Sequence, residues 1–377
     1  MLITQTVGVN DAGVTTETPE AQPDGLQKKM AEEFRFQSAG CAEIGSKVYA
    51  DLCLVCADDI ERSGPVWAAM ADHAHLRFGL ALPLRFLAAV HRLALNGDVP
   101  QLAAHFLSCG GSPTPSLAAD FIAAVHAHRR QVASELDWGV QTNEVVRTAA
   151  LFPGLAHITA LTGQPLSLRE IGTSAGLNLR LDHFHYAQGT WSAGDPAGAV
   201  DIVDRWGEQT PPTTQVHIID RAGCDPSPID STTPQGAIHL LGFLWPDQED
   251  RRTRTLGAIE TAKRFPARID AMAAEAWLRH ELASRPSHAT TVIMHSIVWQ
   301  YIDRDERRRI TELVESVGLS ATVDAPLAWL SFEPHEPHRK HAALTLRLWD
   351  GGRHAGEPTH LAESGFHGQW VRWLAGG

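Results

Sequence analysis

Three scarcities in the sequence exclude several classes of protein. The chain has few cysteines, no long hydrophobic run and fewer basic than acidic residues. Its 377 residues include 5 cysteines, which are too few and too scattered for a disulfide framework in a chain of this length. No window approaches the ~18 to 20 apolar residues that cross a bilayer, and the N-terminus lacks the features of a signal peptide. We therefore expect a cytoplasmic protein without a membrane partner.

The charge balance argues against nucleic acid as a partner. Lys and Arg total 32 against 44 for Asp and Glu, which gives a net charge of −12. Non-specific binding to nucleic acid depends on cationic side chains that neutralise phosphates. Hydrophobic residues make up 44% of the chain and charged residues 20%, as is typical of globular proteins. The expected partner is a small-molecule substrate.

Metal ligands are also not arranged in a recognisable pattern. The chain has 20 histidines, but neither H-E-x-x-H nor a Cys-His pattern occurs. Cys53 and Cys56 lie one helical turn apart without a second pair, which favours buried thiols. His335, His338 and His341 cluster in EPHEPHRKH, where two prolines favour a surface loop. We expect no metal site.

The spacing of apolar residues divides the chain into three parts. Residues 1–25 are polar and are expected to form a disordered or loose arm. Over residues 26–161 apolar residues recur at three- and four-residue intervals between Gly and Pro breaks, which predicts a helical bundle or cap. Over residues 162–377 short apolar runs alternate with helical stretches, which predicts an α/β fold with a mostly parallel, Rossmann-like sheet. Ligands of such sheets bind beyond the carboxyl ends of the strands.

The third part contains six candidate strands and three candidate helices. The strands are Leu166–Ile171, Val216–Asp220, Arg268–Met272, Thr291–His295, Ala328–Glu333 and Ala342–Trp349. The helices lie near Asp247–Arg264, Glu275–Ser284 and Asp303–Val317.

The most informative stretch is REIGTSAGLN, residues 169–178. An apolar run ends there in small residues, which predicts a strand, a tight loop and a helix N-terminus. Gly172 and Gly176 allow sharp turns and a close approach to a ligand, and free helix N–H groups offer a weak positive end. The spacing acid-x-Gly-x-Ser-x-Gly resembles the first motif of Rossmann-like methyltransferases that use S-adenosylmethionine. It predicts a cofactor loop that contains Glu170, Ser174 and Asn178.

The same residues spell G-x-S-x-G, the nucleophile elbow of α/β-hydrolases. A hydrolase with Ser174 as nucleophile and His367 as the triad histidine is therefore an alternative. Against it, everything before Leu166 reads helical and lacks the His-Gly-Gly run of an oxyanion loop. A dinucleotide fingerprint fits less well, because two of its three glycines are missing. A non-catalytic ligand-binding protein, or a tight turn without a ligand, is the remaining alternative.

Two acids follow candidate strands at places that suit a nucleoside. Asp220 ends VHIID, the second strand, where a carboxylate can accept hydrogen bonds from both ribose hydroxyls. Glu275 follows the third strand, where it suits the adenine edge or the ribose. The alternative for each acid is an ordinary charge near a helix N-terminus or in solvent.

Two histidines are candidate catalytic bases. His295 closes the apolar strand TTVIM, and a neutral imidazole there can take the proton of an attacking hydroxyl or amine. Ser296 follows it, at a position that suits contact with cofactor and substrate. His367, in SGFHGQW, is the second candidate base.

The substrate side of the site is predicted from two further motifs. Gln141, Asn143 and Arg147 lie in QTNEVVR, and Arg147 can bind a carboxylate in a bidentate fork. Trp245, in FLWPDQEDR, can stack on a substrate. We expect the helical part to cover the carboxyl ends of the strands as a cap, which brings the QTNEVVR side chains to the substrate.

Five stretches carry a resemblance to one family. They are QTNEVVRTAAL, EIGTSAGLNLRLDHFHY, FLWPDQEDR, MHSIVWQYI and FHGQWVRW. Together they resemble the bacterial family called domain of unknown function 2332 over most of the chain beyond the first thirty residues. The resemblance implies a methyltransferase-like Rossmann fold behind a helical N-terminal region, without an established substrate. Where relatives have Gly-Asp-Ala before the third helix, this chain has Ala274-Glu275-Ala276, so an adenine contact of Glu275 depends on a substitution.

Overall fold

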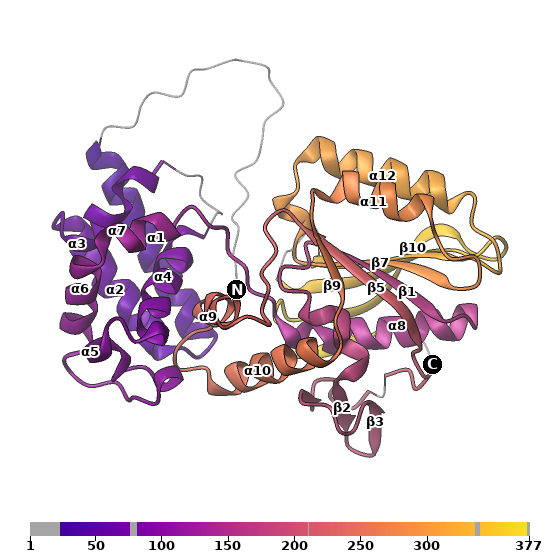
Figure 1. The fold of residues 1–377 in the computed structure, drawn as a ribbon, viewed down its shortest axis with the longest axis horizontal. Helices are drawn as coiled ribbons and strands as arrows, with labels where there is room; N and C mark the ends of the chain where they lie inside the picture. The colour runs from indigo at the N-terminus through magenta and orange to yellow at the C-terminus, as the bar shows by residue number, and fades with distance from the viewer. Residues whose placement is uncertain (1–22, 76–80, 210, 336–339, 375–377) are drawn as a thin grey trace. The chain divides into compact units, whose positions relative to one another are not determined.

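The computed structural model describes residues 23–75, 81–209, 211–335 and 340–374. The chain forms two compact units, which we call the helical unit and the sheet unit (Figure 1). The helical unit extends to Thr142 and includes Ile238–Arg252, and the sheet unit contains Asn143–Ala237 and Thr253–Gly377. The predicted arm over residues 1–25 lies outside the described residues except at its end, where helix α1 begins at Pro23.

The helical unit is built from short helices around one apolar core. Within that core the rings of Phe34 and Phe86, and of Phe86 and Phe121, meet edge to face. This matches the helical period of the sequence over most of the predicted cap. Its helices are α1 (Pro23–Glu43), α2 (Lys47–Glu61), α3 (Pro65–Met70), α4 (Leu82–Asn96), α5 (Pro100–Ala103), α6 (Leu117–Ala127) and α7 (Arg129–Glu135).

A later segment of the chain completes the helical unit. It contains the end of α9 (Pro234–Gly242) and the start of α10 (Glu249–Arg264). Asp247 accepts hydrogen bonds from the Ser46 hydroxyl at 2.5 Å and from the Val48 N–H at 3.0 Å. It thus satisfies a free N–H in the first turn of α2.

The sheet unit confirms the predicted α/β fold with a mostly parallel central sheet. The strand order is β11-β10-β9-β8-β7-β1-β5-β6. Strands β6, β5, β1, β7 and β8 run parallel, and β9, β10 and β11 continue the sheet antiparallel. The strands are β1 (Leu166–Ile171), β5 (Ile218–Asp225), β6 (Arg268–Ala271), β7 (Thr290–Ser296), β8 (Leu327–Pro334), β9 (Ala342–Trp349), β10 (Ala355–Ser364) and β11 (Val371–Trp373).

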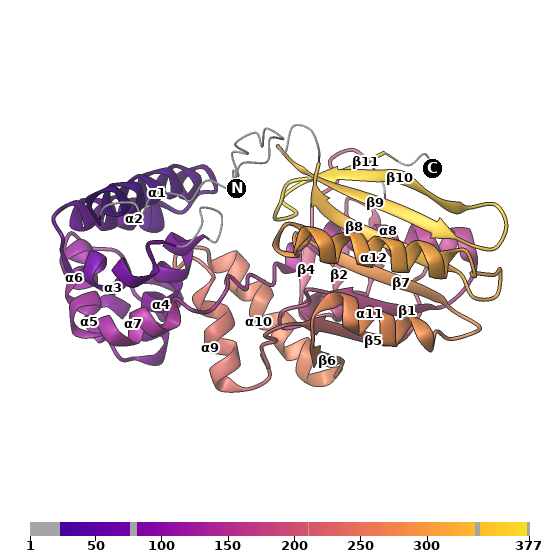
Figure 2. The ribbon, with the colours of Figure 1, turned by 90° about the horizontal axis from the view of Figure 1, so that it is seen from above.

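This strand order places a switch point between β1 and β7. From β1 the chain continues to β5 and β6 on one side, and then to β7 and β8 on the other. Helices α11 (Ala274–Ala283) and α12 (Arg304–Gly318) cover one face, and α8 (Thr148–Thr162) covers the other (Figures 1 and 2). In open parallel sheets, ligands bind at the carboxyl ends of the strands beside the switch point.

Helix α8 belongs to the sheet unit, although the sequence places it at the end of the cap. Contrary to the expectation from the sequence, the stretch Val145–Thr162, which contains a short 3₁₀ turn and α8, is long and apolar enough to span a membrane; 72% of it is buried within the structure, as in a core helix. Pro153 lies inside the helix and has no N–H to offer the carbonyl of Ala149. The indole N–H of Trp206 donates to that carbonyl instead, at 3.0 Å.

The helix predicted after Gly176 is wrong. The chain forms a kinked 3₁₀ segment, Leu177–His183, in which Arg180 has non-helical backbone angles. Leu177, Leu179 and Leu181 are fully buried, and their spacing of two residues would spread them around an α-helix. A small sheet follows, made of β2 (His185–Gln188), β3 (Trp191–Gly194) and β4 (Asp201–Val203) in the order β3-β2-β4.

Candidate functional site

Strained backbone marks the carboxyl ends of β1 and β7. These strands are neighbours, with Glu170 opposite Met294. Ser174 follows β1 with φ 55°, and Ile297 follows β7 with φ 52°. A residue other than Gly in this left-handed region costs about 1–3 kcal/mol and is an outlier when it is β-branched. Because such strain concentrates at functional sites, this edge of the sheet is the candidate site.

Gly172 and Gly176 shape the loop after β1, but not in the predicted way. Both have φ +66°, which only glycine adopts without strain. A Cβ on Gly172 would lie 2.2 Å from Cγ2 of Val298, and one on Gly176 would lie 2.5 Å from Cδ1 of Ile269. The missing side chains therefore make room for protein neighbours, whereas we expected them to make room for a ligand.

Two N–H groups of this loop donate to side chains. The Ser174 N–H donates to Oδ2 of Asp225 at 3.0 Å, and the Leu177 N–H donates to Oδ1 of Asn143 at 2.9 Å. Asn143, predicted to bind substrate, therefore holds the loop. Asp225 also accepts from the Ser227 N–H at 2.9 Å, so it fixes the loop from the end of β5.

Several buried polar atoms at this edge have no hydrogen-bond partner among the described residues. They include Oγ of Ser174, Oδ1 of Asn178 and Nε2 of His295. The three residues are 8%, 1% and 2% exposed. A buried polar group without a partner costs about 1–3 kcal/mol, and such groups are rare in folded proteins. These atoms are the hydrogen-bonding groups that a ligand can satisfy.

Glu170 lies beneath the loop as a buried acid. It is 2% exposed and accepts a hydrogen bond from the Thr173 hydroxyl. Burial raises the pKa of the Glu170 carboxyl to about 8, and the hydrogen bond from Thr173 opposes this rise. Below that pH the carboxyl is protonated, so it acts as a neutral part of the loop.

His295 forms a dyad with Glu333, a residue that the sequence reasoning missed. Nδ1 of His295 lies 2.7 Å from Oε1 of Glu333, which also accepts from the N–H groups of Val298 and Trp299 at 3.1 and 3.2 Å. The Trp299 ring stacks on the imidazole with centroids 5.0 Å apart. In the neutral ring, a carboxylate at this distance favours the proton on Nδ1, which leaves the lone pair on Nε2. Glu333 meets His295 only because strand β8 packs beside β7. The position of Glu333 in the sequence therefore does not predict the pair.

Arg147, predicted to bind a substrate carboxylate, donates to two backbone carbonyls. It is 9% exposed. Its Nε donates to the carbonyl of Phe366 at 3.0 Å, and its Nη1 donates to the carbonyl of Ser296 at 3.2 Å. Arg147 therefore joins the end of β7 to the turn before β11, and Ser296 contributes its backbone to this link.

His367 pairs with an acid rather than with the serine. Its Nδ1 lies 3.4 Å from Oε2 of Glu144, and the Glu144 carbonyl accepts from Nδ2 of Asn178 at 3.4 Å. Since the Ser174 hydroxyl has no partner among the described residues, no Ser–His triad is formed. The segment 143–147 thus connects three motifs: the loop after β1, the end of β7 and the turn at His367.

The predicted location of Asp220 is wrong. The second strand continues through Ala222 and Cys224, both 1% exposed, to Asp225. Asp220 lies opposite Ser167 near the start of β1 and pairs with Arg169 at 2.7 Å. The residue at the carboxyl end is Asp225. We placed the end of this strand at Asp220, where the apolar run VHII stops, which is five residues before Asp225.

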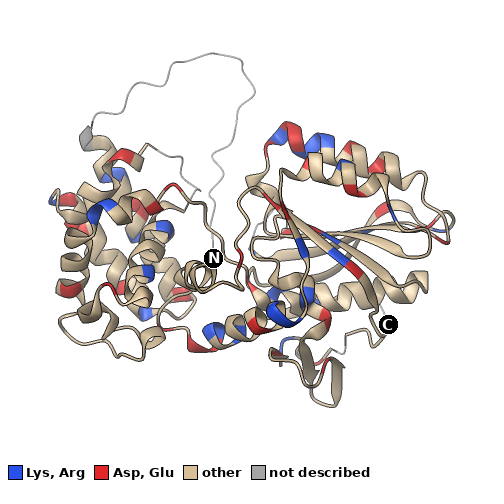
Figure 3. Cartoon of the chain, in the orientation of Figure 1, with Lys and Arg blue, Asp and Glu red and all other residues tan. Residues whose placement is uncertain are grey.

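Glu275 follows the third strand as predicted, but it is engaged with basic side chains. It lies in the first turn of α11 and pairs with Arg309 at 2.6 Å and Arg279 at 2.8 Å. Hydrogen bonds from Arg309 and then Arg279 lower the pKa of Glu275. Both signs of charge occur along α11 and α12 (Figure 3), so an ordinary surface ion pair accounts for this acid.

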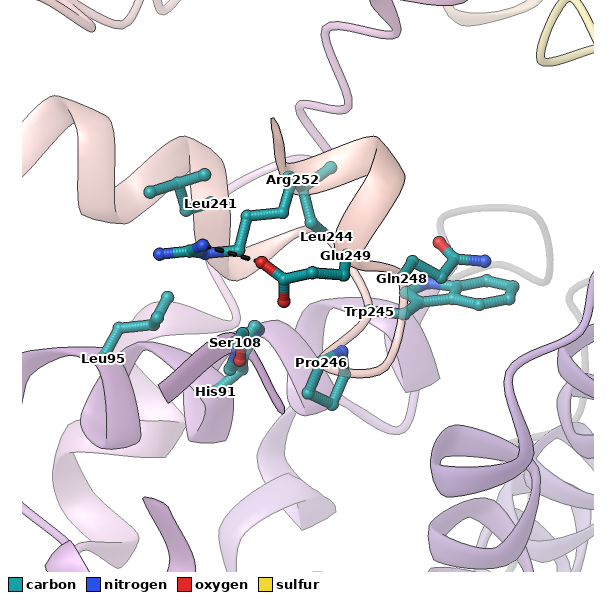
Figure 4. A pocket seen from close by; sticks show the side chains of 10 residues that line it. All are labelled: His91, Leu95, Ser108, Leu241, Leu244, Trp245, Pro246, Gln248, Glu249 and Arg252. Atoms are coloured by element: carbon teal, nitrogen blue, oxygen red, sulfur yellow. Dashed lines mark hydrogen bonds and ion pairs between the residues drawn. The ribbon is translucent and has the colours of Figure 1, made fainter. Parts of the chain in front are cut away.

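Gln141 and Trp245 belong to the helical unit. Trp245 is 7% exposed in the core of that unit, with its ring 6.0 Å from that of Tyr49. It lies beside a narrow crevice that has no room for a water molecule (Figure 4). The lining residues are His91, Leu95, Ser108, Leu241, Leu244, Trp245, Pro246, Gln248, Glu249 and Arg252.

Polar groups beside this crevice hold the segment Ile238–Arg252 in place. Nε2 of His91 lies 2.7 Å from the Ser108 hydroxyl, and Nδ1 lies 3.3 Å from the Gly242 carbonyl. Burial lowers the pKa of His91 to about 4. The neutral ring therefore donates to the carbonyl and accepts from the hydroxyl. Ligand pockets usually measure about 300–1,000 Å³, so this crevice is too narrow for a ligand.

The histidine cluster lies at the ends of β8 and β9. The rings of His335 and His341 stack with centroids 5.3 Å apart, and His338 lies outside the described residues. Within the described ranges, no group of His, Cys, Asp and Glu side chains is arranged to hold a metal ion.

Comparison with known proteins gives a family but no characterised relative. Searches of curated proteins and of solved structures found no significant match. The model of one family, described as an uncharacterised protein conserved in bacteria, matches residues 31–373. That range includes nearly the whole chain, so the protein belongs to the bacterial family of domain of unknown function 2332.

Proposed function

We propose that the sheet unit binds S-adenosylmethionine at the carboxyl ends of β1 and β5 and transfers its methyl group to a small molecule. One observation carries the proposal: buried polar atoms without partners and two strained residues meet beside the switch point of a parallel sheet. Ligands of such sheets bind at this place.

The residues at this edge fit a nucleoside cofactor. Each carboxylate oxygen of Asp225 accepts one N–H, and a carboxylate has about four lone-pair sites. Asp225 therefore retains capacity for the ribose hydroxyls, in the role that we first gave to Asp220. Ser174 Oγ and Asn178 Oδ1 offer further hydrogen bonds. Bound S-adenosylmethionine would supply an electrophilic methyl group.

His295 is the base of this proposal. Glu333 holds its Nδ1 proton at 2.7 Å, which leaves the Nε2 lone pair to take a proton from the attacking atom. The carboxylate also stabilises the imidazolium that forms. His367 has the same kind of partner in Glu144, but its side chain is 25% exposed and therefore less well fixed.

A serine hydrolase is the second candidate function. The positive φ of Ser174 favours it, because a nucleophile elbow places its serine on such a strained turn. The lack of a histidine on Ser174 Oγ among the described residues argues against it. A fluorophosphonate probe that labels Ser174 would decide for the hydrolase.

Calorimetry with two matched variants tests the cofactor site. Asp225→Asn and Asp220→Asn remove the same charge from opposite ends of β5. We expect Asp225→Asn to weaken S-adenosylmethionine binding about 10-fold or more, because hydrogen bonds to charged groups contribute about 1.5–3 kcal/mol. Asp220→Asn should lower stability through Arg169 and leave affinity unchanged. Absence of binding to the wild type, or equal losses in both variants, would refute the proposal.

A further inference from the structure

The unsatisfied hydrogen-bonding groups of the site are mostly acceptors. Nδ2 of Asn178 faces the Glu144 carbonyl, which can only accept, so the free atom of the amide is Oδ1. The Nδ1 proton of His295 faces Glu333, so the free Nε2 is an acceptor too. The second carboxylate oxygen of Glu333, Oε2, is buried and has no partner among the described residues. A ligand that satisfies these atoms must donate hydrogen bonds.

The cations near these acceptors are directed to the backbone. Arg147 donates to the carbonyls of Ser296 and Phe366. Arg180 donates to the carbonyls of Gly176 and, at 3.0 Å, Phe265. These bonds fix both guanidinium groups to the backbone, and their positive charges remain. The case for a hydrogen-bond-donating ligand therefore rests on the acceptor atoms.

We infer that the small molecule bound beside His295 is an amine, bound through its N–H groups in the protonated state. A protonated amine has up to three donors and one positive charge, which match Oδ1 of Asn178, Nε2 of His295 and Oε2 of Glu333. The segment 144–147 links these groups, because Glu144 binds Asn178 and Arg147 binds the residue after His295. The inference rests on the proposed function, since it names the substrate class of that site.

Two matched pairs of probes test the inference in the wild-type protein. Phenethylamine is compared with 3-phenylpropionate, and butylamine with butyrate, by calorimetry in the presence of S-adenosylhomocysteine. We expect saturable binding of at least one amine and binding of its matched carboxylate at least ten-fold weaker. A carboxylate that binds as tightly as its amine, or no binding of either amine, would overturn the inference.

A pair of carboxylate variants tests the contribution of Glu333. Asp350 is a matched control, because it accepts from Nδ1 of His354 at 2.6 Å and from the N–H groups of Gly352 and His354. It lies just beyond Trp349, which pairs with the first residue of β8, so it belongs to the opposite edge of the sheet. We expect Glu333→Gln to weaken amine binding about ten-fold or more, and Asp350→Asn to leave it unchanged. Equal affinity of wild type and Glu333→Gln, at an unchanged melting temperature, would contradict the role of Glu333.

The cofactor measurement separates the two proposals. If S-adenosylhomocysteine binds and neither amine does, the amine inference fails and the cofactor site stands. If an amine binds selectively and neither S-adenosylhomocysteine nor S-adenosylmethionine does, the methyltransferase proposal fails and the amine site stands.

Discussion

Replacing Ser174 with glycine separates the two candidate enzymes. Ser174 has φ 55° and a buried hydroxyl without a partner among the described residues. Glycine removes a backbone strain of about 1–3 kcal/mol and adds an unfolded-state entropy cost of about 0.5–1 kcal/mol. In the free protein the Ser174 hydroxyl has no hydrogen-bond partner among the described residues, so replacing it with glycine breaks no such bond. We therefore expect Ser174→Gly to raise the free energy of unfolding by about 1 kcal/mol.

The same variant should retain the cofactor site. In the motif acid-x-Gly-x-Ser-x-Gly, Ser174 stands midway between two glycines, at a backbone angle that glycine prefers. Urea unfolding and calorimetry with S-adenosylmethionine are compared for wild type, Ser174→Gly and Ser174→Ala. Ser174→Ala keeps the strain and lacks the hydroxyl, so its affinity shows the contribution of Oγ, about 1 kcal/mol. Asp204→Gly, at φ 55° in the same unit, is the control for strain relief alone.

Two results would refute this reasoning. If Ser174→Gly is less stable than the wild type, the serine forms an interaction that the structure does not describe. If the wild type reacts with a fluorophosphonate probe and both Ser174 variants do not, Ser174 is a nucleophile and the methyltransferase assignment is wrong.

Three further predictions concern stability. Because the folded-state pKa of Glu170 is raised to about 8, the sheet unit should lose stability as pH rises from about 4.5 to about 8; Glu170→Gln should flatten this dependence in urea unfolding. His91 has the opposite sign, since its pKa is lowered to about 4, so the helical unit should lose about 3 kcal/mol as pH falls from about 6.5 to about 4. Trp206→Phe should cost about 1–3 kcal/mol by leaving the Ala149 carbonyl without a donor. In a Pro153→Ala background the cost should be smaller, because alanine at that position restores the helical N–H; an equal cost in both backgrounds would contradict this account.

The sequence predicts the fold better than it predicts the site. The buried parallel strand β7 has a continuous apolar run at its centre, which periodicity detects directly. The bounds of β5 differ from the predicted strand at both ends. Its continuation to Asp225 is not predicted, because Arg221 and Gly223 interrupt the apolar run, although the sheet buries their neighbours. The 3₁₀ segment after Gly176 was also missed. Its alternating leucines are buried by tertiary packing, which local propensity does not encode.

The candidate site was missed where it depends on partners distant in sequence. The motif correctly places His295 at the end of a strand. The acid that pairs with it, Glu333, lies 38 residues away on a strand whose neighbour in the sheet the sequence does not reveal. Arg147 shows the opposite case, because its residue type fits a carboxylate while its Nε and Nη1 donate to two backbone carbonyls. A side chain's type limits which bonds it can form, and the fold decides which of them it does form. The atoms left without partners after that decision, at Ser174, Asn178 and His295, are therefore better indicators of a ligand than the charged residues that the motifs contain.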